Sequence, residues 1–316
     1  MKLNKKHKIC LFLALTLTAV VLCTLPFLAV KKDIIYVYTQ SKQPLSKEKG
    51  FIRELQIQGY KVIVNSIDLP TEEDYAFWFK NPEDINTISQ SSAKINFLYT
   101  EAYYPINWEG VKNMPVILTP YKALYEHYTR SNIKTALLTM GVNLSEFYMS
   151  GETKKYPLTY YGDNNKIIPL SDILNKEKIK LIGNFWQDRN LVLAQNNDKS
   201  EERRKALSQS KIVVVYNQPN APEAQKIPDE IMEATASGAL VFTSVNPAVY
   251  ELYKDNVIYY KNRQDFLEKK DYFLKRYDQV LSKILAAEKI TAQNVSSKAT
   301  AQRFKEILTW MKENSH

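Results

Sequence analysis

The side chains best suited to chemistry in this sequence are found in its C-terminal half. The apolar run Ile212–Tyr216 leads into the polar residues 217–227, and a predicted helix follows at Asp229–Ser237. Glu233 lies near the middle of that helix, and the small residues after it end in Gly238. A carboxylate at this position can accept hydrogen bonds from two neighbouring hydroxyl groups, such as those of a ribose. A solvated or helix-capping glutamate fits the same spacing.

Side chains for nucleophilic or metal chemistry are scarce. Cys10 and Cys23 are the two cysteines and both lie in an apolar N-terminal run, while His127 is the one histidine inside the predicted fold. The sequence therefore disfavours a thiol nucleophile, a Ser-His-Asp triad and a multi-histidine metal site, and no metal ligand is assigned. We expect His127 to be a surface residue of a helix. The sequence contains no G-x-G-x-x-G and no Walker A pattern, which disfavours a dinucleotide or P-loop site of the usual kind.

Predicted strands and helices alternate from Asp33 onward. The predicted strands are Ile34–Tyr38, Lys61–Val64, Ile95–Tyr99, Pro115–Leu118 and Thr135–Thr139, followed by Leu158–Tyr161, Ile179–Ile182, Ile212–Tyr216, Leu240–Thr243 and Val257–Tyr260. The predicted helices are Lys47–Tyr60, Tyr121–Ser131, Glu201–Ser208, Asp229–Ser237 and Ser297–Asn314. This alternation predicts parallel sheets with helices on both faces, and so an α/β fold of two Rossmann-like domains that face each other across a cleft.

The polar stretch Met140–Lys155 interrupts the alternation and is predicted to connect the two domains. The chain length of 316 residues also suits two domains. The expected organisation has four parts. They are residues 1–32 as cytoplasmic tail and membrane anchor, 33–145 and 146–296 as the N-terminal and C-terminal Rossmann-like domains, and 297–316 as a C-terminal helix.

The N-terminal run Ile9–Val30 consists of 22 uncharged and mostly apolar residues. At a rise of 1.5 Å per residue, a helix of this length spans a hydrocarbon core of about 30 Å. Four lysines precede the run, which favours a single-pass protein with a cytoplasmic N-terminus. A cleaved signal peptide is the alternative, although its apolar region is ordinarily shorter. The lysines place the body beyond the membrane, whereas a body without cysteine is typical of a cytosolic protein, so its side stays open.

Charge and composition exclude several functional classes. Hydrophobic residues make up 45% of the chain and charged residues 24%, which is a globular composition. The net charge is +9, but residues 1–32 carry six lysines and no acidic residue. Because most of the positive charge belongs to this segment, and no basic stripe with interleaved aromatic residues follows it, nucleic-acid binding is disfavoured.

Residues Glu233–Thr243, with the sequence EATASGALVFT, resemble the donor-binding region of GT-B glycosyltransferases. The resemblance is strongest to the spore-maturation (CgeB-like) group and to the glycosyl transferases group 1 family. Three further segments resemble the same family. Asn246–Leu252 resembles its continuation, Thr119–Leu124 a helix start in its N-terminal domain, and Met140–Phe147 the segment that crosses between its domains.

The resemblance implies a membrane-anchored, metal-independent enzyme that moves a sugar from a nucleotide-sugar to a glycan, lipid or protein acceptor. The donor is a substrate, so no cofactor is implied. The donor-binding residues that the resemblance implies are Glu233, Gly238, Lys226, Gln225, Asn217 and Gly162. Glu233 would bind the nucleoside ribose. Glu101, which follows the strand Ile95–Tyr99, is a candidate general base, and an ordinary loop carboxylate is the alternative.

The sequence also departs from the family pattern. Retaining relatives have two glutamates separated by seven residues, and Gln225 stands at the first of these positions. Asp163 stands where the family has basic residues for the donor diphosphate, and it would repel one. Two other functions therefore stay open. They are a catalytically inactive GT-B-like binding protein and an exported two-lobed solute-binding protein.

Overall fold

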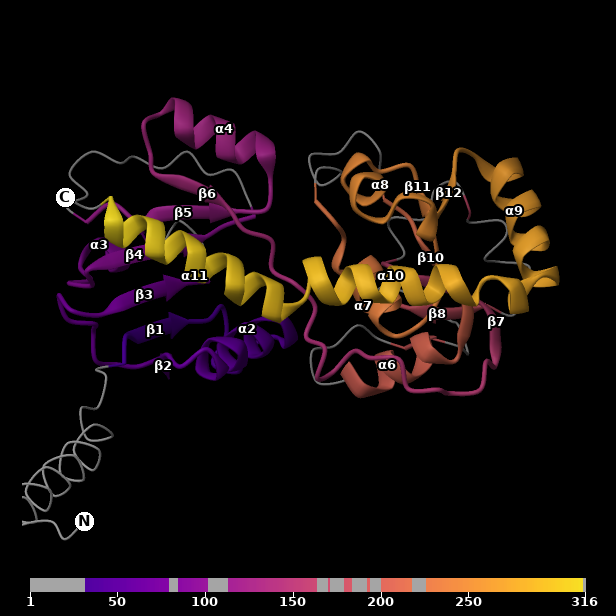
Figure 1. Cartoon of the computed structure of the whole chain (residues 1–316), viewed down its shortest axis with the longest axis horizontal. Coiled ribbons are helices and arrows are strands. Elements are labelled where there is room, and N and C mark those ends of the chain that lie inside the picture. The colour runs from indigo at the N-terminus through magenta and orange to yellow at the C-terminus, as the bar shows by residue number, and fades with distance from the viewer. Residues whose placement is uncertain are drawn as a thin grey trace, which may run out of the picture. The chain divides into compact units, whose positions relative to one another are not determined.

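The computed structural model describes residues 32–79, 85–101, 113–163, 170, 179–183, 192–193, 200–217 and 226–314. The predicted anchor at Ile9–Val30 and the predicted donor-binding residue Gln225 lie outside these ranges. No helix within them is long and apolar enough to cross a membrane. The described chain contains two six-stranded parallel sheets (Figure 1), so the predicted α/β class is confirmed.

The first sheet has the strand order β2-β1-β3-β4-β5-β6. Its strands are β1 (Ile34–Tyr38), β2 (Lys61–Val64), β3 (Tyr75–Trp78), β4 (Ile95–Tyr99), β5 (Val116–Thr119) and β6 (Thr135–Leu137). Five of these were predicted within two residues at either end. Strand β3 was not predicted, yet it pairs with both β1 and β4 at the centre of the sheet.

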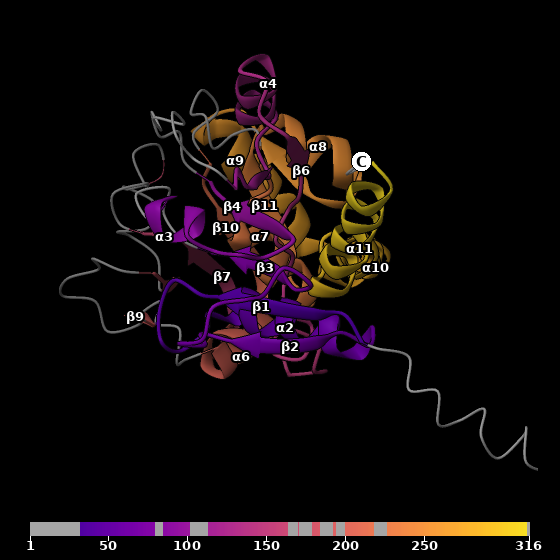
Figure 2. The same cartoon turned by 90° about the vertical axis from the view of Figure 1, so that its left-hand side faces the viewer.

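Helices cover both faces of the first sheet (Figure 2). One face packs against α2 (Ser46–Ile57) and α11 (Ser297–Glu313), and the other against α3 (Ile85–Ser89) and α4 (Lys122–Arg130). Helix α11 comes from the C-terminal end of the described chain, and Figure 1 shows it beside β1–β5. We call residues 34–139 together with α11 the first lobe.

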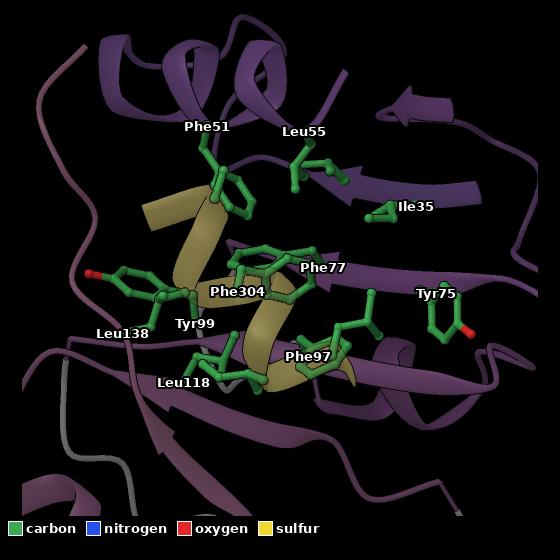
Figure 3. Close-up of a cluster of buried hydrophobic side chains, with 14 of the residues drawn as sticks. Ile35, Phe51, Leu55, Tyr75, Phe77, Phe97, Tyr99, Leu118, Leu138 and Phe304 are labelled. Atoms are coloured by element: carbon green, nitrogen blue, oxygen red, sulfur yellow. The ribbon is translucent and has the colours of Figure 1, made fainter. Parts of the chain in front are cut away.

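Aromatic rings from distant segments fill the core of the first lobe (Figure 3). Phe304 of α11 is fully buried, and its ring centroid lies 5.6 Å from that of Phe51, 5.2 Å from that of Phe77 and 4.9 Å from that of Phe97. Edge-to-face contacts of this kind add to the free energy gained by burying the rings. Phe304, Ile307, Leu308 and Met311 have the i, i+3, i+4, i+7 spacing that places them on one face of α11, and all four side chains are buried.

The second sheet has the strand order β12-β11-β10-β7-β8-β9. Its strands are β7 (Tyr156–Tyr161), β8 (Lys180–Ile182), β9 (Val192–Leu193), β10 (Ser210–Val215), β11 (Leu240–Ser244) and β12 (Ile258–Tyr260). Its helices are α6 (Ser200–Ser208), α7 (Asp229–Ala236), α8 (Pro247–Tyr253), α9 (Arg263–Lys275) and α10 (Leu281–Asn294). We call residues 156–294 the second lobe. Helices α8, α9 and α10 were not predicted, although Asn246 and Asn262 cap the first two through their side chains.

The chain passes between the lobes twice, and the two passages are hydrogen-bonded to each other. The amide of Val142 donates to the carbonyl of Val295 at 2.9 Å, and the amide of Ser297 donates to the carbonyl of Val142 at 2.9 Å. Gly141 is required at this crossing, because a Cβ there would lie 2.4 Å from the backbone carbonyl of Ser296. The predicted connection at Met140–Lys155 thus includes the outgoing passage.

Candidate functional site

A cleft of about 350 Å³ lies where the two lobes meet. Its lining comes from the first lobe, the outgoing passage and the second lobe. The residues are Leu45, Ser46 and Lys47; Met140, Gly141, Val142 and Asn143; and Asp163, Arg203, Asp229, Glu230, Met232 and Glu233. Asp163 follows the carboxyl end of β7, which is the edge of a parallel sheet where ligands ordinarily bind.

Glu233 is presented to this cleft by α7, as the sequence predicted. Pro228 precedes the helix, and Gly238, with a φ of +75°, follows its C-cap residue Ser237. The Glu233 side chain is 13% exposed, so it lies at the cleft wall and is neither turned into the core nor fully solvated. The small residues Ala234, Thr235 and Ala236 follow Glu233 in α7 and are buried, so this end of the helix packs closely on the second sheet.

Two buried side chains hold the Glu233 carboxylate. The hydroxyl of Tyr161 donates to its Oε2 at 2.5 Å, and the Nε of Arg203 lies 3.5 Å from the same oxygen. Burial raises the pKa of Glu233 to about 7, although the Arg203 charge and the Tyr161 hydrogen bond oppose the shift. Near neutral pH the group therefore occupies both protonation states, and its ionised form is the stronger acceptor of hydroxyl hydrogen bonds.

Neither Arg203 nor Tyr161 was singled out from the sequence. They lie 30 and 72 residues from Glu233 along the chain, on α6 and at the end of β7. The parallel pairing of β7 with β10, ahead of α7, brings them together. Arg203 lies on the predicted helix Glu201–Ser208, but its burial is visible only in the structure, so the sequence alone carried no signal for this contact.

Glu101 lies two residues beyond β4 and contacts both lobes. Its Oε1 accepts hydrogen bonds from the Tyr99 hydroxyl at 2.9 Å and from the Lys47 ammonium at 3.3 Å. Its Oε2 accepts from the Lys226 ammonium at 2.5 Å. Burial alone would raise the pKa of Glu101, but the two ammonium groups outweigh it and lower that pKa to about 2.

The low pKa bears on the predicted role of Glu101 as a general base. A carboxylate that releases its proton so readily is a poor proton acceptor near neutral pH. Both of its oxygens are also occupied in this arrangement. The structure therefore favours an ion-pairing role for Glu101, and its role as a base stays a prediction.

Lys47 extends the Glu101 contacts to the second lobe. Its ammonium also lies 3.3 Å from Oδ2 of Asp229, in the first turn of α7. Lys226, Glu101, Lys47 and Asp229 form a series of alternating charges, which we call the interlobe ion chain. Sequence reasoning found Lys226 and Glu101 separately but missed Lys47 and Asp229, since the latter pair is 182 residues apart along the chain.

The remaining predicted donor residues lie at different places in the second lobe. Gly238 is buried at the end of α7, where its amide donates to the carbonyl of Thr235 and its carbonyl accepts from Lys154. It is not part of the described cleft lining and ends α7, and its donor contact stays a prediction. Asn217 is buried two residues beyond β10, and its backbone N–H donates to the hydroxyl of Ser244. Gly162 directly precedes Asp163 of the cleft.

Acidic side chains outnumber basic ones at the cleft. Asp163, Asp229, Glu230 and Glu233 line it, against Lys47 and Arg203. The predicted conflict between Asp163 and an anionic donor therefore persists in the structure. His127 is exposed on α4, in agreement with its predicted surface position.

Comparisons with known proteins agree with this geometry. Residues 167–309 match a family model described as glycosyl transferase-like. The fold is similar to that of HepE from Anabaena, solved in complex with UDP-glucose, at a TM-score of 0.59 and 11% identity over 87% of this chain and 99% of that one. It is also similar to a DNA-modifying β-glucosyltransferase, at a TM-score of 0.62 and 12% identity over 87% of this chain and 98% of that one.

An α1,3-fucosyltransferase is a third similar structure, with a TM-score of 0.55 and 12% identity over 89% of this chain and 92% of that one. A comparison of the sequence with curated proteins finds no match. The resemblance to GT-B glycosyltransferases that the sequence suggested is therefore confirmed at the level of fold and family model. The narrower resemblance to the spore-maturation group stays a prediction.

Proposed function

We propose that this protein transfers a sugar from a nucleotide-sugar donor to an acceptor hydroxyl, in the cleft between its lobes. One observation carries the proposal. The carboxylate of Glu233 faces the cleft from α7, within the part of the chain that matches the glycosyl transferase-like family model. There it can accept the two hydroxyl hydrogen bonds of a ribose.

The chemistry needs three things from the chain. Glu233 binds the nucleoside, basic side chains neutralise the leaving diphosphate, and a base takes the acceptor proton. The acceptor oxygen forms a bond to the anomeric carbon of the sugar while the bond from that carbon to the donor phosphate oxygen breaks. Positioned cations and backbone amides can stabilise the leaving diphosphate without a metal ion, and we infer a metal-independent enzyme with no further cofactor.

We further propose that residues 9–30 anchor the protein in a membrane with the N-terminus on the cytoplasmic side. The length and uncharged character of this run support the proposal. A membrane anchor favours an acceptor found at a membrane, which is a lipid or a growing glycan. The division at 1–32, 33–145, 146–296 and 297–316 is proposed with it. A tag-accessibility assay at either end of the chain tests the orientation.

Calorimetric titration of the full-length protein with a panel of nucleoside diphosphates and their sugar conjugates tests the main proposal. We expect at least one nucleotide-sugar to bind. The Glu233→Gln variant should bind it about tenfold to a hundredfold more weakly, because hydrogen bonds to a charged acceptor are lost. Glu251→Gln, on the exposed face of α8, is the matched control and should bind as the parent does. Absence of binding across the whole panel would contradict the proposal.

A second candidate function is a nucleotide-sugar binding protein without transferase activity. The observation in its favour is the occupation of Glu101 by two lysines, which leaves that carboxylate unsuited to remove a proton. Binding of a donor without hydrolysis or transfer across glycan and lipid acceptors would support this candidate. Detection of a transferred sugar would rule it out.

A further inference from the structure

The contacts of Glu101 resemble those of a bound anion more than those of an ordinary surface ion pair. One carboxylate oxygen contacts Lys47 from the start of α2 in the first lobe, and the other contacts Lys226 from the second lobe. The two ammonium groups thus each contact a different oxygen of one carboxylate. Two oxygens of a phosphate group are spaced much like the two oxygens of a carboxylate, so the same two lysines can hold a phosphate in the same way.

We propose that Lys47 and Lys226 form a split clamp for the diphosphate of the donor, with one lysine from each lobe. In the absence of donor, Glu101 and Asp229 occupy the clamp, and the incoming diphosphate replaces them. The identity of the anion rests on the proposed function. The clamp itself rests on the interlobe ion chain.

Burial and position support the clamp. The side chains of Lys47 and Lys226 are 26% and 19% exposed, which is low for lysine and leaves each ammonium partly desolvated. Lys47 lines the cleft that Glu233 also lines, so a ligand bound by its ribose at Glu233 has Lys47 in the same cavity. Charge–charge contacts in such partly buried sites are screened less by salt than those at the surface.

The charge balance of the cleft also favours this assignment. Asp163 and Glu230 line the cleft as well and oppose the entry of a diphosphate. Arg203, the other cation of the lining, already contacts Glu233. The diphosphate of a nucleotide-sugar carries two negative charges, as many as Glu101 and Asp229 together, so the exchange leaves the charge at the two lysines balanced. Release of Glu101 would at the same time free its carboxylate for other contacts.

Titration with inorganic pyrophosphate and with UDP-glucose tests the clamp on the full-length protein. We expect Lys47→Met and Lys226→Met each to weaken the binding of both ligands about tenfold. Lys122→Met, whose side chain is 78% exposed on α4, is the matched control and should change neither affinity. Glu101→Gln should instead tighten pyrophosphate binding about tenfold, because a competing anion is removed. Uridine has no phosphate, and its affinity should not change in any of these variants.

The outcomes separate the clamp from the proposed function. Pyrophosphate binding that depends on both lysines, together with no binding of any nucleotide-sugar, would leave the clamp standing and contradict the proposed donor. Three results would overturn the clamp. UDP-glucose binding could be unchanged by Lys47→Met, pyrophosphate binding could be weaker in Glu101→Gln, or neither ligand could bind. Thermal unfolding of each variant checks that it folds. If Lys47→Met does not fold, Lys47→Arg should retain pyrophosphate binding and Lys47→Gln should lose it.

Discussion

Glu101 and Glu233 are glutamates of the same cleft region with opposite acid–base properties. Glu101 belongs to the first lobe and Glu233 to the second, and both are partly buried. Burial raises the pKa of each, but two ammonium groups lower that of Glu101 to about 2, whereas one guanidinium leaves that of Glu233 at about 7. The comparison shows that burial and the cations at the carboxylate together set the charge that each lobe presents.

The difference also separates the tasks that the two carboxylates can perform. Glu101 stays ionised throughout the physiological pH range, so it can hold the two lysines but cannot readily take a proton. Glu233 changes its charge near neutral pH, so its capacity to accept hydroxyl hydrogen bonds varies there. A substitution that affects one lobe should therefore leave the pKa of the carboxylate in the other lobe unchanged.

The largest effect is expected from Phe304→Ala, which should destabilise the first lobe, where Glu101 lies. The fully buried ring contacts Phe51, Phe77 and Phe97, so its removal should cost about 3–5 kcal/mol of unfolding free energy. Denaturant unfolding measures the loss, and Lys305→Ala on the exposed face of α11 is the control. Hydrogen exchange should show faster exchange in residues 34–139, with the second lobe still protected. Equal loss of protection in both lobes would mean that they unfold together.

Arg203→Met should have the next largest effect, and it acts on Glu233 alone. Removal of the guanidinium leaves a buried carboxylate held by Tyr161, so the pKa of Glu233 should rise further, and unfolding free energy should fall by about 3 kcal/mol above pH 7. The double variant Arg203→Met with Glu233→Gln should recover part of this loss, because the unpaired charge is gone. No recovery in the double variant would show that Arg203 stabilises the protein by packing, for example on the ring of Phe147.

The pH dependence of donor binding tests whether Glu233, and not Glu101, titrates near neutral pH. UDP-glucose affinity should rise about tenfold between pH 6 and pH 8, since Glu233 with its pKa of about 7 becomes ionised over this range. The diphosphate of UDP-glucose does not titrate there, so the change belongs to the protein. Calorimetry of Glu233→Gln should show a flat profile, and Glu101→Gln should keep the slope of the parent. A slope that persists in Glu233→Gln would assign the titration to another group.

Stability as a function of pH should change with opposite signs for the two carboxylates. The pKa of Glu233 is raised above its usual 4.5, so its contribution is fully present below about pH 4.5 and is lost as the pH rises to about 7. The pKa of Glu101 is lowered, so its contribution is present above about pH 4.5 and is lost as the pH falls toward 2. In thermal unfolding across pH 2–8, Glu233→Gln should flatten the first change and Glu101→Gln the second. If Glu233→Gln instead removed the change below pH 4.5, and Glu101→Gln the change between pH 4.5 and 7, the two pKa assignments would be wrong.

The sequence predicted the parts of the molecule that have local patterns. The buried runs of β1, β4 and β10, the apolar stripe of α11 and the glycine after α7 all follow from rules that need only neighbouring residues. Strand β3 was missed, although it has as many residues as β2 and β5 and lies at the centre of its sheet.

The candidate site could be predicted only in part for the same reason. Glu233 was found because it sits in a local family pattern. Its partners Arg203 and Tyr161, and the pairing of Lys47 with Asp229, depend on how strands and lobes are arranged in space. The contacts join residues between 30 and 182 positions apart, and no single-sequence pattern records them.

Helix α11 has a consequence for how the protein is made. It emerges from the ribosome after the whole second lobe, yet its Phe304, Leu308 and Met311 complete the core formed by strands at the other end of the chain. The strands of the first sheet are synthesised first, and their apolar face stays uncovered while some 150 later residues are translated. This differs from the usual order, in which N-terminal domains fold first. During that interval the nascent chain presents a surface for chaperone binding, and the second lobe is free to fold before the first.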